Sequence, residues 1–301
     1  MSFDSLAAGP EKAKIVSLGR EKCVFEGSGM SASAHLDAGQ VWTAIERLNE
    51  EIDVHQGDTH LVIFLSELLC VSGQWDRAEE QLERVVGQSR EANDDVLVFR
   101  NMVRAERHRR RVFSGVSDPH FVTEPPAYVT LHLDALHKLE RGGLDEVKAL
   151  LDSADGQWCK RPGTMGARSF HSFRDADNLV APVLELIVQD RYIWMPYEQI
   201  QRFEITSPRR LRDLLWVSIR VGGLGGTMLE AFVPVQYAIS CEHSTQQRID
   251  HDPYAAVALR QFLIDGEKRA MLDSREVEFE VNHGAKELHC LATEQPNTNF
   301  M

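Results

Sequence analysis

The stretch Cys70–Leu82, CVSGQWDRAEEQL, shares its spacing with two other stretches of this 301-residue chain. Leu36–Leu48 (LDAGQVWTAIERL) and Leu139–Leu151 (LERGGLDEVKALL) also place an apolar residue, a glycine, an apolar residue, a small residue and a leucine at the same positions. The first two glycines are 34 residues apart, and the third lies 69 residues further on, close to twice that period. A 34-residue period is typical of tetratricopeptide-like helix pairs.

Each position of this pattern has a structural role. Glycine permits the tight reversal between two helices, at Gly39, Gly73 and Gly142. A small residue one turn into the second helix allows the helices to approach closely, and the leucine one turn later fills the groove between them. The alternative is that three permissive matches arise by chance within an all-helical segment. Both interpretations predict helices.

The predicted fold class is multidomain α and β. Ser31 and Ser33 offer caps for a first helix, and further helices are expected at 61–71, 96–113 and 128–140. We expect residues 1–30 to be an N-terminal extension and 31–154 a tetratricopeptide-like helical repeat domain. A small, β-rich, barrel-like domain should follow at 155–281, with a C-terminal tail at 282–301.

The second half of the chain changes from a helical period to short β-type runs. Val183–Val188 and Tyr192–Met195 are separated by three polar residues, which predicts a hairpin. Further strand pairs are expected between 217–221 and 227–235, and between 260–265 and 276–281. A helical turn is expected at 211–216.

Net charge and cysteine spacing limit the classes of partner and the cellular location that we expect. The formal net charge is −13, from 33 Lys and Arg against 46 Asp and Glu. This charge repels phosphate backbones and anionic membranes, so we expect no nucleic acid and no membrane as partner. Scattered cysteines without a Cys-x-x-Cys pair, and no signal peptide or membrane-spanning stretch, predict a cytoplasmic protein. The cysteines are Cys23, Cys70, Cys159, Cys241 and Cys290.

Two motifs suggest phosphate binding but lack the structural features that a phosphate site needs. The glycine-rich segment Gly222–Gly226 is followed by a strand-like run, whereas phosphate loops open a helix, so a hairpin turn is the better interpretation. The arginine-rich run Arg104–Arg111 would point its charges in several directions on a helix, and its surroundings are acidic. We interpret it as a solvated helix end, and no cofactor is implied.

The segment around His171, Asp175 and Asp177 is the best enzymatic candidate. One histidine and two carboxylates could hold a hard metal or act as an acid–base pair, as in a metal-dependent hydrolase. The competing interpretation is that the carboxylates accept backbone N–H bonds at a turn and pair with Arg174, Arg191 or Arg212. No catalytic signature of another class is present, and the expectation is a protein that is not an enzyme.

A set of short motifs resembles a known family. They are Gly73–Leu82, Ala105-Glu106-x-x-Arg109, Asp175-Ala-Asp177, Pro182-Val-Leu-Glu185, Tyr192-Ile-Trp194-Met-Pro196, Leu211-Arg212-Asp213-Leu-Leu-Trp216, and Val233-Pro234 with Tyr237. In this order and spacing the chain resembles, over about 34–281, the ImpE/TagJ family of accessory proteins of the bacterial type VI secretion system. Asn178-Leu179-Val180-Ala181 departs from the family pattern after the Asp-Ala-Asp motif.

The resemblance implies a non-enzymatic accessory or adaptor protein. The implied partner is the small subunit of the contractile sheath, whose N-terminal helix would bind in a groove. Candidate partner-binding residues are Tyr192, Trp194, Trp216, Tyr237, Arg212, Asp213, Asp175 and Asp177. The alternative for the aromatic residues is a buried core, and for Arg212 and Asp213 an internal ion pair. A general repeat scaffold with an unrelated partner is the remaining alternative.

Overall fold

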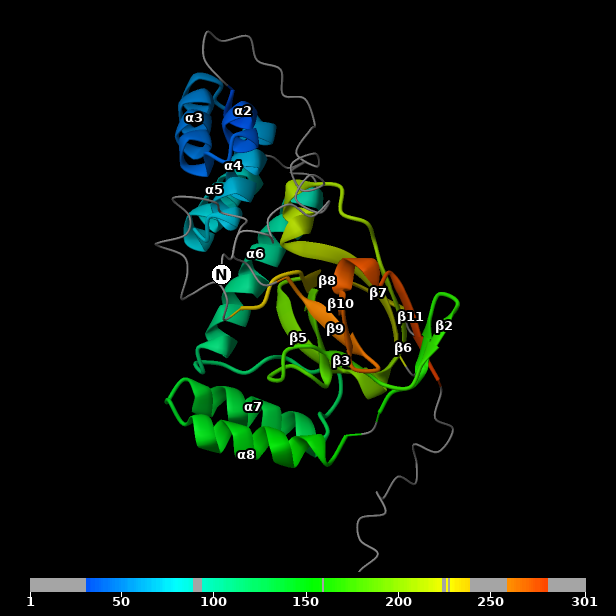
Figure 1. Cartoon of the computed structure of the whole chain (residues 1–301). Coiled ribbons are helices and arrows are strands. Elements are labelled where there is room, and N and C mark those ends of the chain that lie inside the picture. Colours follow the sequence, from blue (N-terminus) through cyan, green and yellow to red (C-terminus); the bar gives the residue numbers. More distant parts are fainter. Residues whose placement is uncertain are drawn as a thin grey trace, which may run out of the picture.

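A computed structural model describes residues 31–88, 94–158, 160–223, 226, 228–238 and 259–280. The predicted extension and tail therefore lie outside the described residues. A helical part comes first and a β part follows (Figure 1). The helices are α2 (Ala32–Asp37), α3 (Val41–Val54), α4 (Thr59–Val71), α5 (Trp75–Gln88), α6 (Asp94–Phe113), α7 (Ala127–Leu139) and α8 (Leu144–Asp155).

The three predicted glycine turns share one conformation. Gly39, Gly73 and Gly142 have φ of 76°, 76° and 77°, a region that side chains disfavour. In each turn the glycine N–H donates to the carbonyl three residues back, and the next N–H to the carbonyl five residues back. This is a helix C-terminal turn of the Schellman type, and it produces the pairs α2–α3, α4–α5 and α7–α8.

Buried residues follow the predicted spacing. In α3, Val41, Ala44, Ile45 and Leu48 are buried, as the helical period requires. The Ser31 hydroxyl accepts from the Ala34 N–H at 3.3 Å and caps α2. The helix predictions at 61–71, 96–113 and 128–140 match α4, α6 and α7 to within a few residues.

The third helix pair is separated from the first two by α6. Figure 1 shows α2–α5 at one end of this 20-residue helix and α7–α8 at the other. The buried apolar residues of α2–α5 form one cluster with the first part of α6, whereas those of α7–α8 cluster with Val183, Tyr192 and Trp194 of the β part. The described helices thus pack as two groups and do not form one continuous stack.

Two antiparallel sheets make the β part. Eight strands pair in the order β2-β1-β11-β6-β7-β8-β4-β5, and three in the order β10-β9-β3. Their bounds are β1 (Gly163–Met165), β2 (Arg168–Phe170), β3 (Phe173–Asp175), β4 (Val183–Val188), β5 (Arg191–Pro196), β6 (Ile200–Ile205), β7 (Trp216–Gly223), β8 (Met228–Pro234), β9 (Gln261–Ile264), β10 (Glu267–Ala270) and β11 (Glu276–Phe279). Short 3₁₀ turns are η1 (Tyr197–Gln199), η2 (Leu211–Leu214) and η3 (Met271–Asp273).

Two of the three predicted strand pairs are confirmed. β4 pairs with β5, and β7 pairs with β8, both antiparallel. The predicted pairing of 260–265 with 276–281 is wrong. Asp265 and Gly266 have φ of 50° and 84°, which forms a tight turn that pairs β9 with β10, while β11 inserts between β1 and β6 of the larger sheet.

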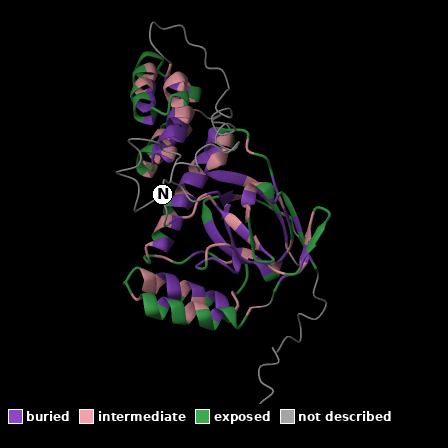
Figure 2. Cartoon of the chain, in the orientation of Figure 1, coloured by how far each residue is buried: buried purple, intermediate pink, exposed green. Residues whose placement is uncertain are grey.

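The sheets enclose an aromatic core without closing a barrel. Phe173 from the small sheet lies 5.9 Å from Phe203 and 5.2 Å from Phe279 of the large sheet, between ring centroids. The edge strands β2 and β5 do not pair with each other in the described residues, so the barrel-like closure that we predicted is not formed there. The buried residues of this core come from strands of both sheets, and Figure 2 shows much of these strands as buried.

Within the described residues, no helix combines the length and the apolar character that crossing a membrane would need.

Candidate functional site

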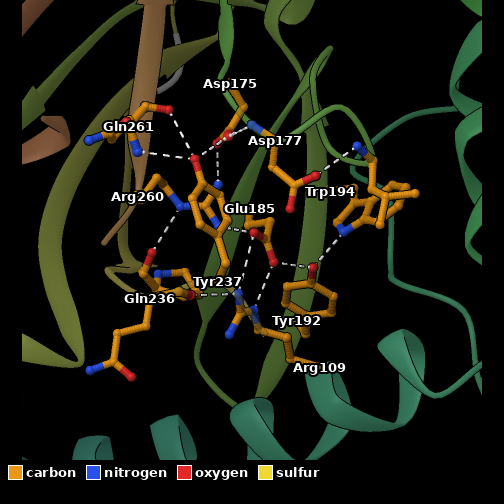
Figure 3. Close-up of polar contacts among 12 residues, drawn as sticks. Arg109, Asp175, Asp177, Glu185, Tyr192, Trp194, Gln236, Tyr237, Arg260 and Gln261 are labelled. Atoms are coloured by element: carbon orange, nitrogen blue, oxygen red, sulfur yellow. Dashed lines mark hydrogen bonds and ion pairs between the residues drawn. The ribbon is translucent and has the colours of Figure 1, made fainter. Parts of the chain in front are cut away.

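A cluster of charged side chains is buried where α6 meets the two sheets. We call it the buried network, and Figure 3 shows its centre. Its charged members are at most 4% exposed, and aromatic residues surround them. They are Glu106 and Arg109 from α6, Asp175 from β3, Glu185 from β4, and Arg260, which directly precedes β9.

Glu185 lies at the centre of the buried network and is fully buried. Its carboxylate accepts from Arg109 Nε at 2.7 Å, from Arg260 Nη2, and from the hydroxyl of Tyr192. The Tyr192 oxygen in turn accepts from the indole N–H of Trp194 at 2.5 Å. Each oxygen of the carboxylate therefore has a donor, and this compensates for its removal from water.

Asp175 binds Arg260 through a different guanidinium nitrogen from the one that contacts Glu185. Its oxygens accept from Arg260 Nη1 at 2.5 Å, from the hydroxyl of Tyr237 at 2.6 Å, and from the N–H of Asp177 at 2.9 Å. Burial raises the pKa of the Asp175 carboxyl, while the Arg260 charge and the donated hydrogen bonds oppose that rise. Three donors around one carboxylate are the arrangement that the ionised form requires.

Glu106 connects the network to the helices. It accepts from the indole N–H of Trp216 at 3.1 Å and from Arg109 Nη1 at 3.2 Å. Arg109 also donates to the carbonyl of Gln236 at 2.8 Å, beyond the end of β8. One helix, four strands (β3, β4, β5 and β7) and the residues that flank β8 and β9 therefore meet in a single set of hydrogen bonds.

Comparison with known proteins places the chain in a family. Residues 167–278 match the family described as ImpE protein. The type VI secretion system accessory component TagJ of Pseudomonas aeruginosa is 32% identical over 269 residues, which cover 87% of this chain and 96% of TagJ. The chain belongs to the ImpE/TagJ family.

A solved structure supports the fold of this ImpE/TagJ chain. The X-ray crystal structure of protein VPA1032 from Vibrio parahaemolyticus superposes with a TM-score of 0.73 at 21% identity. The match covers 84% of this chain and 99% of the other. A sequence of helices followed by antiparallel sheets is therefore found in a crystal structure as well.

Four of the candidate residues from the family motifs belong to the buried network. Tyr192, Trp194 and Trp216 are at most 1% exposed, and Asp175 is fully buried. This burial agrees with the core alternative for the aromatic residues. Tyr237 and Asp177 lie at the edge of the network and keep part of their surface exposed.

Arg212 and Asp213 are not paired with each other. Arg212 binds Asp95 of α6 and lies 4.0 Å from Glu67 of α4, whereas Asp213 accepts the N–H groups of Arg209 and Arg210 at 2.8 and 2.9 Å. The expected pair fails because a carboxylate at the start of a 3₁₀ turn is within reach of the free backbone N–H groups there. Burial raises the pKa of Glu67 to about 7, although Arg212 opposes the shift.

The proposed metal site does not assemble. Asp175 is bound by Arg260, and Asp177 accepts the N–H of Leu179 at 2.9 Å, as the turn interpretation expected, but the arginine partner is none of the three that we considered. His171 has a side chain 92% exposed and lies 3.8 Å from Asp265. Among the described residues no three His, Cys, Asp or Glu side chains gather as a metal site would require.

The arginine run is not a simple solvated helix end. Arg109 points into the buried network, while Arg104 and Arg107 bind Glu79 of α5, with Arg104 Nε 2.7 Å from that carboxylate. Arg110 lies over the ring of Trp75 at 4.7 Å. These are specific contacts because α5 presents acidic and aromatic side chains along its packing edge.

The sequence predicts Arg260 only as the first residue of a strand and gives no sign of its role in the network. Arg260 stands 85 residues from Asp175 and 75 from Glu185, so no local period or spacing links them. A signal was present at Glu185, because it is a charged residue inside the apolar run Val183–Val188. Such residues are rarely buried unless they are paired.

Proposed function

We propose that this chain is a non-enzymatic accessory component of a bacterial type VI secretion system, acting in the cytoplasm. The observation that carries the proposal is the 32% identity to TagJ, which extends over 96% of that protein. Because the likeness spans both the helical and the β part, it favours a shared role of the whole chain over reuse of one domain.

We further propose that the helical domain, 31–154, binds the N-terminal helix of the small sheath subunit. Helix α4 is apolar around most of its circumference, and Val62, Ile63 and Phe64 remain only half-buried in the chain alone. On the neighbouring α3, Trp42 is 41% exposed. The apolar face of a partner helix could cover these half-exposed apolar side chains.

The β-rich domain, 155–281, has a supporting role in this proposal. Its buried network fixes α6, and α6 contacts both groups of helices. Every charged group of that network is engaged by another, which favours a structural rather than a catalytic role. Asp177, Asp213 and Tyr237, which keep exposed surface, remain candidates for partner contact at the junction of the two domains.

The decisive experiment compares two forms of the small sheath subunit. Purified chain is titrated with the full-length subunit and with a version that lacks its first helix, and binding is followed by isothermal titration calorimetry. We expect binding to the first and none to the second. Equal binding to both, or to neither, would remove the sheath-helix proposal and leave a scaffold with another partner.

A matched pair of substitutions locates the surface. Trp42→Ser should weaken binding about tenfold, because an aromatic residue at an interface commonly contributes over 1 kcal/mol. Val116→Ser is the control, since Val116 is 73% exposed but follows the end of α6, outside the α2–α5 group. Equal effects of the two substitutions would exclude the α3–α4 surface.

A further inference from the structure

An open depression lies where α5 begins, between α5 and the last turns of α6. We call it the Trp75 depression. Its volume is about 680 Å³, and its lining includes five arginines but only two acidic residues. The chain as a whole has a net charge of −13, so this basic surface stands out against an acidic protein.

The five arginines of the depression differ in how they are paired. Arg110 Nε lies 3.4 Å from the carboxylate of Glu106. Arg104 and Arg107 are neutralised by carboxylates of α5, among them Asp76, which lies 2.7 Å from Arg107. Arg77 and Arg111 are exposed and have no carboxylate partner among the described residues. The surplus positive charge is therefore concentrated at the Trp75 end.

Trp75 supplies an unused donor in the same place. Its indole N–H is buried and has no acceptor in the described part of the chain. The guanidinium of Arg110 lies over the ring, 4.7 Å from its centroid, and the ring of Trp216 makes an edge contact at 5.7 Å between centroids. A buried donor without a partner is costly, and an acceptor supplied by a ligand would remove that cost.

The start of α5 adds to the positive potential. The first turn of a helix presents N–H groups and a partial positive charge. The side chain of Gln74, which precedes α5, is occupied elsewhere: its amide nitrogen donates to Ser72 at 2.9 Å and its oxygen accepts from Arg77 at 2.5 Å.

We propose that the Trp75 depression binds a short acidic segment of a partner protein, with carboxylates bound by Arg77, Arg111 and the indole N–H, and an apolar side chain against the Trp75 ring. A long polyanion such as RNA fits poorly, because the adjoining depression along α5 is lined by four carboxylates against three arginines. An inorganic ion would occupy only a small part of the volume. The site goes beyond the proposed function and does not depend on the sheath subunit.

The test uses a fluorescein-labelled peptide of about eight residues, mostly Glu with one central Leu, and its Lys counterpart. Fluorescence anisotropy with the full chain should show saturable binding of the Glu peptide and none of the Lys peptide. Binding should be stronger at about 50 mM than at about 300 mM salt, because exposed charge pairs are screened. Arg77→Gln with Arg111→Gln should weaken it about tenfold through the loss of two exposed pairs.

The controls separate this site from general electrostatics. Arg141→Gln with Arg168→Gln removes the same charge from exposed positions elsewhere and should leave the affinity within about twofold. Trp75→Phe keeps a ring but removes the donor, and it should weaken binding several-fold. Equal affinity of the two arginine double variants, no binding by the unaltered chain, or equally effective displacement by inorganic phosphate or polyuridine would overturn the proposal.

Discussion

Two sets of arginine–carboxylate pairs lie along α6, and they differ in exposure. The buried network joins Arg109 to Glu185 with side chains 2% and 0% exposed. The outer set joins Arg104 to Glu79 with side chains 40% and 15% exposed. Chemically the pairs are alike, but water solvates the outer set and is excluded from the inner one.

This difference predicts unequal consequences of the same mutation. An exposed pair gains little because water already solvates both charges, whereas removing one member of a buried pair leaves the other without compensation. The buried network should therefore fix how the helices sit on the sheets, and the outer pairs should contribute little to stability and remain available for recognition.

The largest effect is expected for Glu185→Gln. This change leaves Arg109 and Arg260 buried with one carboxylate fewer, and it should lower the free energy of unfolding by about 3–5 kcal/mol. Urea denaturation followed by circular dichroism measures it. A loss below about 1 kcal/mol would show that water reaches the buried network in solution, and the buried and outer sets would then not differ in their effect on stability.

A pH effect should come from Glu67. Burial raises the pKa of Glu67 to about 7 in the folded state, so the folded chain holds its proton more tightly than the unfolded chain does. The stability that Glu67 contributes is therefore fully present below pH 4.5, its unfolded pKa, and is lost as pH rises through about 7. At pH 8 the loss approaches about 3 kcal/mol relative to pH 4. Glu67→Gln should flatten this part of the stability profile, measured as the urea midpoint from pH 5 to 8. An identical profile for the variant would show that another group titrates.

A smaller effect is expected for Trp216→Phe. Phenylalanine keeps most of the packing against Phe99, whose ring lies 6.4 Å away, but removes the N–H that Glu106 accepts. The lost hydrogen bond and volume should cost about 2 kcal/mol of unfolding free energy. Thermal unfolding checks the value, with Trp42→Phe as a control at an exposed position.

The smallest effect is expected for Glu79→Gln in the outer set. Losing its pairs with Arg104 and Arg107 should cost less than about 1 kcal/mol, and added salt should shrink the difference from the unaltered chain. Denaturation at low and high salt measures both. A cost comparable with that of Glu185→Gln would mean that exposure does not distinguish the two sets.

Much of the fold could be predicted because its signals are local. Gly73 lies at a helix turn and Val183–Val188 in a hairpin because neighbouring residues decide those conformations. The pairing of β11 was missed because its partners, β1 and β6, lie far from it in the sequence. The separation of α7–α8 from the other helices was missed for a related reason: the spacing predicts helix pairs but not which surface each pair contacts.

The candidate site was only partly predictable. The motifs singled out Asp175, Tyr192 and Trp216 as important residues, and the structure buries all three. Their partner Arg260 had no signal of its own. An ion pair between residues 75 to 85 positions apart exists only once the strands are assembled.

The sequence by itself determined the helix pairs, two of the three strand pairs and membership of the ImpE/TagJ family, because periodicity, turn residues and motif order are properties of the linear chain. Tertiary structure alone decided which arginines are buried and which remain exposed. Burial depends on all the elements that surround a side chain, and for charged residues it decides whether a pair holds the fold together or stays accessible to a partner.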